Sequence, residues 1–299
     1  MSVTEQTTVG GQSLEGRRQR LGASEAAIAL GASPYGSAFE LWCQKTGAIS
    51  PDDLSDVEHV QWGVNLERPI LEEYGRRTGR TIAYYWPQDK WVTHSEIPWL
   101  SCTPDAFQDR EGSRGIAQVK NTGEYSRSLW HDGTPLHVQI QVQTEMEVCG
   151  FDWGTIVVLI GGNKLRYFDV ERNQSFINAM LPVLKEFWDR VENGDPPLAD
   201  GSFATSRALA KLYPGDNGSE VELPAEAAEW DSELLLLKQE IKSLEQLKGL
   251  LENRLKAAIG DATLALIPGG GAYSFKQQTR KAYEVKESTY RVLRRLISK

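Results

Sequence analysis

The stretch "GIAQVKN", Gly115 to Asn121, reads as a short apolar strand that ends in a lysine, Lys120. Gln118 precedes this lysine by two residues, so both side chains point to the same face of the strand. Upstream lies "LSCTPDAF", with Asp105 directly after Pro104, and the loop "DREGSR" between the two segments is typical of a hairpin. We therefore expect two neighbouring strands that bring Asp105, Gln118 and Lys120 together.

These side chains suit a metal site. Neighbouring strands lie about 4.8 Å apart, so the side chains of Asp105 and Lys120 can converge on one metal-sized volume. Mg²⁺ prefers oxygen ligands, which the Asp105 carboxylate, the Gln118 amide and the Val119 carbonyl offer. Lys120 can lower the pKa of an attacking water and stabilise charge on a phosphate. An acid followed by a strand with acid-x-Lys is a common metal-dependent nuclease pattern, and here the second acid is an amide.

A second carboxylate is available from "WGVNLERPILEEYGRRTG". Its candidates are Glu67, Glu72 and Glu73. The alternative is that all three are solvated glutamates on a helix, with partners one turn away.

Composition and charge limit the class of protein. The apolar fraction of 40% is ordinary for a globular chain, and no apolar run approaches the ~18 residues of a membrane span. The polar N-terminus and three widely spaced cysteines lead us to expect a cytoplasmic protein without a signal peptide, disulfides or a zinc site. The net charge of -8 argues against a globally basic nucleic-acid binder but leaves room for a local basic groove.

The order of elements predicts an α/β domain with a mixed sheet flanked by helices. A mainly helical segment, Pro51 to Thr78, precedes three strand-like segments, "TIAYYW", "PWLSCTPDAF" and "RGIAQVKN". A helix over "PLHVQIQVQTEMEVCG", a hairpin turning at "GGNK" and a helix ending at Gly194 follow. We expect a disordered leader over 1–15, the α/β domain over 16–195, a linker over 196–225, and a long helix, β-hairpin and basic tail over 226–299.

Five segments of the chain resemble, in order and spacing, the YqaJ-like viral recombinase family, which belongs with lambda exonuclease in the PD-(D/E)XK nuclease superfamily. They are "GASEAAIALGASPYGSAFELWCQKTG", "QWGVNLERPILEEYGRRTG", "PWLSCTPDAF", "GIAQVKN" and "PLHVQIQVQTEMEVCG". The resemblance covers about residues 17 to 195 and implies a restriction-endonuclease-like fold.

The resemblance also implies roles for individual residues. Glu67 and Asp105 match metal ligands, Lys120 matches the catalytic lysine, and Gln141 matches a polar residue of the active-site helix. Gln118 stands where the family usually has Glu, which removes one negative charge and should weaken metal binding. The matches to DNA phosphate ligands are Ser24, Ser33 and Arg17, with Arg18 and Arg20 as alternatives to Arg17.

The implied activity is a Mg²⁺-dependent DNA exonuclease of phage recombination, with Mn²⁺ as an alternative ion. It would digest linear duplex DNA from its ends in the 5′ to 3′ direction, in the host cytoplasm. A single-strand annealing protein is the implied partner, and a homo-oligomer is suggested by analogy. Two alternatives stay open at this point: a catalytically impaired DNA-binding or scaffold relative, and a structure-specific endonuclease.

Other features carry less specific signals. His131 and His137 flank Pro135 without a metal-ligand spacing, so surface or core positions are expected. The long helix shows the 4-3 spacing of a coiled coil, and could dimerise, recruit a partner or pack on its own domain. The tail from Lys276 to Lys299 holds eight lysines and arginines against two glutamates, which suits either duplex DNA or solvent.

Overall fold

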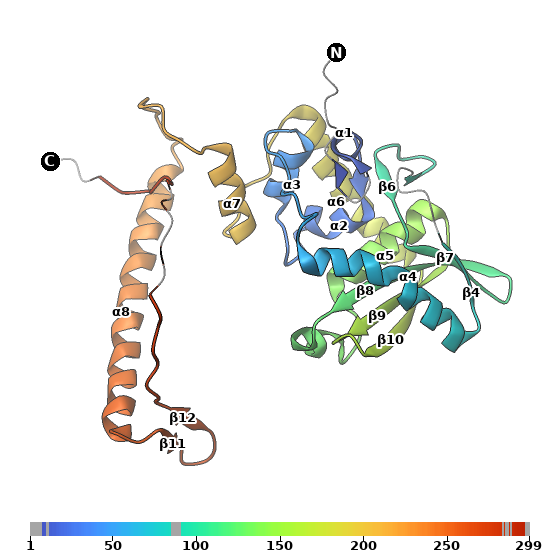
Figure 1. The fold of residues 1–299 in the computed structure, drawn as a ribbon. Coiled ribbons are helices and arrows are strands. Elements are labelled where there is room, and N and C mark those ends of the chain that lie inside the picture. Colours follow the sequence, from blue (N-terminus) through green and yellow to red (C-terminus); the bar gives the residue numbers. More distant parts are fainter. Residues whose placement is uncertain are drawn as a thin grey trace. The chain divides into compact units, whose positions relative to one another are not determined.

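A five-stranded sheet with the strand order β10-β9-β8-β7-β4 lies at the centre of the fold (Figure 1). Its strands are β4 (Thr81–Tyr84), β7 (Ala106–Arg110), β8 (Ser113–Thr122), β9 (Trp153–Ile160) and β10 (Lys164–Glu171). β8 pairs in parallel with β9, while the other neighbours are antiparallel. This arrangement confirms the predicted α/β fold with a mixed central sheet.

The computed structural model describes residues 8–9, 12–84, 91–282, 284, 287 and 289–296. The chain divides into two compact units, residues 1–214 and 215–299, which we call the first and second unit. The leader expected over 1–15 lies partly outside the described residues. The part that is described forms the short strands β1 (Thr8–Val9) and β2 (Gln12–Ser13) and the start of helix α1 (Leu14–Arg18).

Two helices cover the two faces of the sheet. Helix α4 (Glu58–Thr78) places Ile70, Leu71 and Tyr74 against Ala117 and Val119 of β8. Helix α5 (Leu136–Cys149) packs on the other face, where Val138, Val142 and Met146 meet Ile116 and Ile156. Because successive side chains of a strand point to opposite faces, Gln118 and Lys120 share the α5 face with Ile116.

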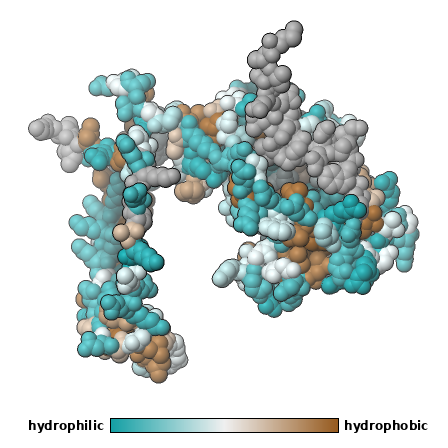
Figure 2. All heavy atoms as spheres, in the orientation of Figure 1, coloured by the Kyte–Doolittle hydropathy of each residue, from teal (hydrophilic) through white to brown (hydrophobic). Residues whose placement is uncertain are grey.

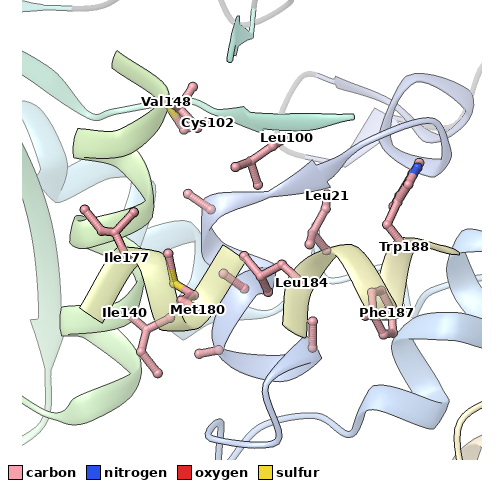
Figure 3. Close-up of a cluster of buried hydrophobic side chains, with 14 of the residues drawn as sticks. Leu21, Leu100, Cys102, Ile140, Val148, Ile177, Met180, Leu184, Phe187 and Trp188 are labelled. Carbon is pink, nitrogen blue, oxygen red and sulfur yellow. The ribbon is translucent and has the colours of Figure 1, made fainter. Parts of the chain in front are cut away.

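A second core lies beside the sheet (Figure 3). It is built by α2 (Ala23–Ala29), α3 (Ala38–Lys45), α6 (Gln174–Asn193) and one side of α5, which adds Ile140 and Val148. A small sheet completes it, with the order β3 (Leu21–Gly22), β6 (Leu100–Cys102), β5 (Val92–Thr93). Helix α6 contributes Ile177, Met180, Leu184, Phe187 and Trp188, which recur at helical spacing and are all buried. This core anchors α2, which carries Ser24.

The segment "PWLSCTPDAF" does not form the single strand that the sequence predicts. Its first half is β6 (Leu100–Cys102), which pairs with β3 (Leu21–Gly22) and β5 (Val92–Thr93), and its last residues begin β7. Pro104 lies between the two strands and has no N–H to continue a ladder. Asp105 is therefore a junction residue directly before β7.

Both predicted hairpins of the central sheet are confirmed. The β7–β8 turn uses Glu111 and Gly112, which have φ angles of 55° and 86°, as a two-residue type I′ turn requires. The β9–β10 turn falls at the predicted glycines, since Ile160 pairs with Lys164. The helix expected from Pro51 begins later, at Glu58, and continues through Pro69.

The range 196–225, expected as a linker, contains helix α7 (Phe203–Leu212). Its Ala208 is buried against Phe39 and Cys43 of α3, so the first unit extends to Pro214. The composition of this range predicted a linker because the helix is short and is surrounded by Pro, Gly and Asp residues.

The second unit contains the long helix α8 (Ala227–Ile259) and a small hairpin of β11 (Leu264–Leu266) and β12 (Ala272–Ser274) (Figure 1). The face drawn in Figure 2 is mostly hydrophilic on both units, with scattered hydrophobic patches. No helix of the described residues combines the length and hydropathy that a bilayer span needs.

Candidate active site

The end of the β7 ladder creates the centre of the candidate site. β7 pairs with β8 only as far as Ala106 opposite Ala117, so the next residues of β8 have no strand partner on that side. The Asp105 carboxylate takes that place: its Oδ2 accepts the Val119 N–H at 2.7 Å and the Gln118 Nε2 at 2.6 Å. Asp105 and Gln118 therefore meet, as predicted.

A chain of polar side chains continues from β8 to α5. The Lys120 Nζ donates to the Gln141 Oε1 at 2.9 Å, and the Gln141 Nε2 donates to the Glu145 Oε1 at 2.8 Å. Gln141 and Glu145 are four residues apart on α5, which places them on the same side of the helix. Lys120 therefore contacts Gln141, and Glu145 adds a carboxylate to this chain of side chains.

Glu145 is the site residue that the sequence reasoning missed. It is 1% exposed, and its Oε2 has no hydrogen-bond partner among the described residues. Burial raises the pKa of Glu145 well above its ordinary value, and the Asp105 charge adds to the effect. The available signal was its spacing: Glu145 follows Gln141 by one turn and lies between the apolar positions Val142 and Met146.

Glu67 reaches the site from α4. It is half-buried, just before Ile70 and Leu71 pack on the sheet. Burial, and then the Asp105 charge, raise the pKa of Glu67 to about 8, although Lys120 pulls it downward.

The other two glutamates of α4 lie elsewhere. Glu72 pairs with Arg68 at 3.0 Å, and Glu73 pairs with Arg76 and Arg77 at 2.7 Å, all with partly exposed side chains. They are solvated glutamates with partners one turn away, as the alternative interpretation predicted.

The site has too little positive charge for its carboxyl groups. Burial raises the pKa of Asp105 to about 6, against the opposing effects of Lys120 and the bonds from Val119 and Gln118. Asp105, Glu67 and Glu145 all have raised pKa values, with Lys120 as their shared cation. A bound divalent cation would favour the ionised forms of these acids, since opposite charge lowers a carboxyl pKa.

The donor set fits a hard cation. The Gln118 Oε1 is buried and has no hydrogen-bond partner among the described residues, because the Nε2 of the same amide faces Asp105. No three His, Cys, Asp or Glu side chains form a metal-binding group in the described ranges. The groups that could hold a cation here are the Asp105 and Glu67 carboxylates and the Gln118 amide oxygen, and the Val119 carbonyl stays a predicted ligand.

A cavity of about 340 Å³ opens next to Lys120 and Gln141. Ser24 and Ser33 both line it, together with His137. Burial, and then the Lys120 charge, lower the pKa of His137, which favours its neutral form. His131 is exposed and contacts Asp132, so the two histidines form no ligand pair.

The predicted arginine lies in a neighbouring cavity. Arg17 contacts Glu25 at 3.4 Å and, with Arg18, lines a second cavity of about 480 Å³. Arg20 instead donates to Thr93 at 2.9 Å. Tyr35 and Ile28 line both cavities. Arg17 is thus next to the Ser24 cavity and does not line it.

The sheet carries an acid directly before one strand and Gln-x-Lys on the next. The chain is similar in fold to the crystal structure of an alkaline exonuclease from Laribacter hongkongensis, with a TM-score of 0.50 and 18% identity over 67% of this chain and 98% of that chain. A phage related exonuclease from Haemophilus somnus 129PT gives a TM-score of 0.42 and 12% identity over 58% and 96% of the two chains.

Sequence comparison identifies the family of the chain. Residues 13–152 match the YqaJ-like viral recombinase domain. The uncharacterized protein YqaJ of Bacillus subtilis (strain 168) is 31% identical over 256 residues, which are 84% of this chain and 78% of that protein. The chain therefore belongs to the YqaJ-like viral recombinase family.

Proposed function

We propose that this protein is a metal-dependent DNA exonuclease that hydrolyses phosphodiester bonds. The observation that carries the proposal is the meeting of Asp105, Gln118 and Lys120 at the end of the β7–β8 ladder, with Glu67 beside them. Hard oxygen donors next to a lysine match the needs of phosphodiester hydrolysis. Family membership supports the same reaction class.

In this proposal, Glu67 and Asp105 hold Mg²⁺, or Mn²⁺, which also prefers oxygen ligands. The Gln118 Oε1 and the Val119 carbonyl complete the protein's donors. When bound, such an ion lowers the pKa of a water and withdraws charge from the phosphate.

Lys120 acts beside these ligands. An ammonium group has three donors, and Gln141 accepts one of them, so the other two can face the attacking water and the phosphate. Gln141 thereby orients Lys120, and Glu145 orients Gln141.

The proposed substrate is the end of linear duplex DNA, digested 5′ to 3′. The hydroxyls of Ser24 and Ser33 line the cavity next to Lys120, where they can donate to a terminal phosphate, and Arg17 in the adjoining cavity can hold the next one. In a phage-type recombination system, the 3′ strand left behind would pass to a single-strand annealing protein in the host cytoplasm.

A nuclease assay tests this proposal. Purified protein is incubated with Mg²⁺ or Mn²⁺ and with circular duplex DNA or linear duplex DNA labelled at the 5′ or the 3′ end. We expect early release of the 5′ label, intact circles and no reaction in EDTA. Lys120→Ala should lower kcat by about 1,000-fold, while Lys185→Ala, a change of an exposed lysine on α6, should leave it unchanged.

Two other outcomes of this assay would indicate a different function. Cutting of circles would identify a structure-specific endonuclease. DNA binding without metal-dependent hydrolysis, equal in wild type and Lys120→Ala, would identify a scaffold relative.

A further inference from the structure

Helix α8 carries a coiled-coil stripe along its whole length. The positions at alternating spacings of four and three residues are Trp230, Leu234, Leu237, Ile241, Leu244, Lys248, Leu251, Leu255 and Ala258. Apart from Lys248, every member of this set is apolar, and the spacing matches the a and d positions of a heptad repeat. A helix of 33 residues is about 50 Å long, enough for more than four heptads.

This stripe is uncovered within the described residues of the second unit. None of the residues of α8 is buried in the part of the chain that the structure describes. Leu244 is 64% exposed and Leu251 is 51% exposed, whereas the leucines of α6 are largely covered. A helix with one long apolar side gains its stability by burying that side against another element.

We propose that α8 pairs with α8 of a second copy of this chain in an antiparallel two-stranded coiled coil. Centring the pair on Ile241 and Leu244 aligns both helices over their full length. Ile241 then packs on Leu244 of the second copy, Leu234 on its Leu251, and Trp230 on its Leu255. The end layers join Ala227 and Ala258, which are small enough to close the seam.

The lysine in the stripe decides between the two orientations. A parallel pair in register would place Lys248 directly opposite Lys248 of the second copy, and two facing ammonium groups repel each other in a dry layer. The antiparallel pair places Lys248 opposite Leu237 instead. Its long apolar stem can then cover the layer while its charge reaches the solvent near Glu252, 3.7 Å away in its own helix.

Charges beside the stripe favour the same orientation. In the antiparallel pair, Glu233 faces Arg254 and Lys238 faces Glu245, and symmetry repeats both attractive pairs. The parallel pair keeps one attraction, Glu233 with Lys238, and places Glu240 opposite Glu245.

One like-charge approach remains in the antiparallel pair, Asp231 with Glu252. The tail of the same chain counters it, because Arg295 donates to both oxygens of Asp231 at 2.9 Å. Charge complementarity therefore points to a second, antiparallel copy as the occupant of the stripe.

Sedimentation equilibrium of the full chain tests the pairing. Leu244→Lys should raise the dissociation constant between copies about 100-fold, because it removes two leucines from the central layers. The control is Gln246→Lys, which adds the same charge on the opposite side of α8 and should leave the constant unchanged. A wild-type chain that stays monomeric at every concentration, or a Leu244→Lys chain that associates like wild type, would overturn the proposal.

A charge exchange tests the orientation without touching the core. Glu233→Arg and Arg254→Glu should each weaken association about tenfold, and the double variant should restore it, since it rebuilds the same pair in reverse. In a parallel pair, the double variant would place a cation at position 233 opposite Lys238, so association would stay weak. That result would overturn the antiparallel arrangement. Circular dichroism of each variant checks that α8 remains helical.

Discussion

Helices α6 and α8 have similar amphipathic patterns and opposite surroundings. Each carries large apolar side chains at helical spacing. α6 buries five of them, from Ile177 to Trp188, within the first unit, while α8 exposes its leucines in the described second unit. The comparison teaches that an apolar stripe predicts that a helix packs against another element. Only the tertiary structure shows which element covers the stripe. The first unit supplies its own partners for α6, whereas the stripe of α8 has no covering element among the described residues of the second unit.

The carboxyl groups of the two units differ in the same way. In the first unit, Asp105 and Glu145 are drawn into the protein next to Lys120, and burial raises both pKa values. In the second unit, Glu252 is exposed between Lys248 and Lys256, at 3.7 and 3.8 Å. Exposed pairs of this kind contribute little to stability.

Truncating one leucine in each helix should separate the two kinds of stripe. Leu184→Ala in α6 should lower the free energy of unfolding by about 2–5 kcal/mol, because it opens a cavity in a closed core. Leu251→Ala in α8 should leave that transition unchanged. Denaturant unfolding followed by tryptophan fluorescence reports on the first unit, which holds every tryptophan except Trp230. Equal losses in the two variants would show that α8 is part of the same cooperative core.

The buried polar chain should matter for activity where an exposed carboxylate does not. Glu145→Leu should lower kcat by about 10- to 100-fold with little change in KM, because Gln141 loses the acceptor that orients it toward Lys120. Glu145→Gln should restore most of the rate, since its amide oxygen can accept the same bond. The matched change in the second unit, Glu252→Leu, should leave kcat unaltered. A Glu145→Gln variant as slow as Glu145→Leu would contradict this positioning role.

The stability of the metal-free first unit should fall as pH rises. Burial and the Asp105 charge raise the pKa of Glu67 from 4.5 to about 8, so the native carboxyl keeps a proton that the unfolded chain has already lost. We expect the melting temperature in EDTA to decrease between about pH 5 and about pH 8. Mg²⁺ should raise it more at the higher pH, where its ligands are ionised.

Two variants test whether Glu67 causes this pH dependence of the melting temperature. Glu67→Gln should make it shallower, since the amide does not titrate, while Asp105 and Glu145, whose pKa values are also raised, should keep part of it. Glu252→Gln in α8 should preserve the full slope. A slope that is identical in Glu67→Gln and wild type would assign the effect to other groups.

The smallest effect concerns the amide in the site. Gln118→Glu adds the missing charge and should lower the Mg²⁺ concentration for half-maximal rate about three- to tenfold. The same change removes the Nε2 donor to Asp105, so the metal-free variant should also melt at a lower temperature. An unchanged metal dependence would show that the Gln118 Oε1 is not a ligand.

The sequence predicted the parts of the site that depend on local patterns. Gln118 and Lys120 share a face because strands have a period of two, and the β7–β8 hairpin follows from a turn that accepts left-handed residues. Those features brought Asp105 close to Lys120, as expected. The break at Pro104 was missed because β6 and β7 are short and adjacent, so only their pairing with different sheets separates them.

Residues that meet across the fold were harder to infer. Glu145 was missed because the sequence does not show which side chains pack against the apolar face of α5 that carries this carboxylate. The family resemblance matches Arg17 to a phosphate ligand, and the structure places Arg17, which contacts Glu25, at the neighbouring cavity.

The sequence by itself determined the α/β class, the strand that carries Lys120, the helix with Gln141 and the heptad stripe of α8. These depend on periods of two, 3.5 and 3.6 residues, which are local properties of a chain. The family resemblance already pointed to Glu67, whereas only the tertiary structure decided that Glu145 from a second helix also approaches Asp105, with Lys120 as the shared cation. The physical reason is that burial and charge, which set the pKa of each group, depend on neighbours that are distant in sequence.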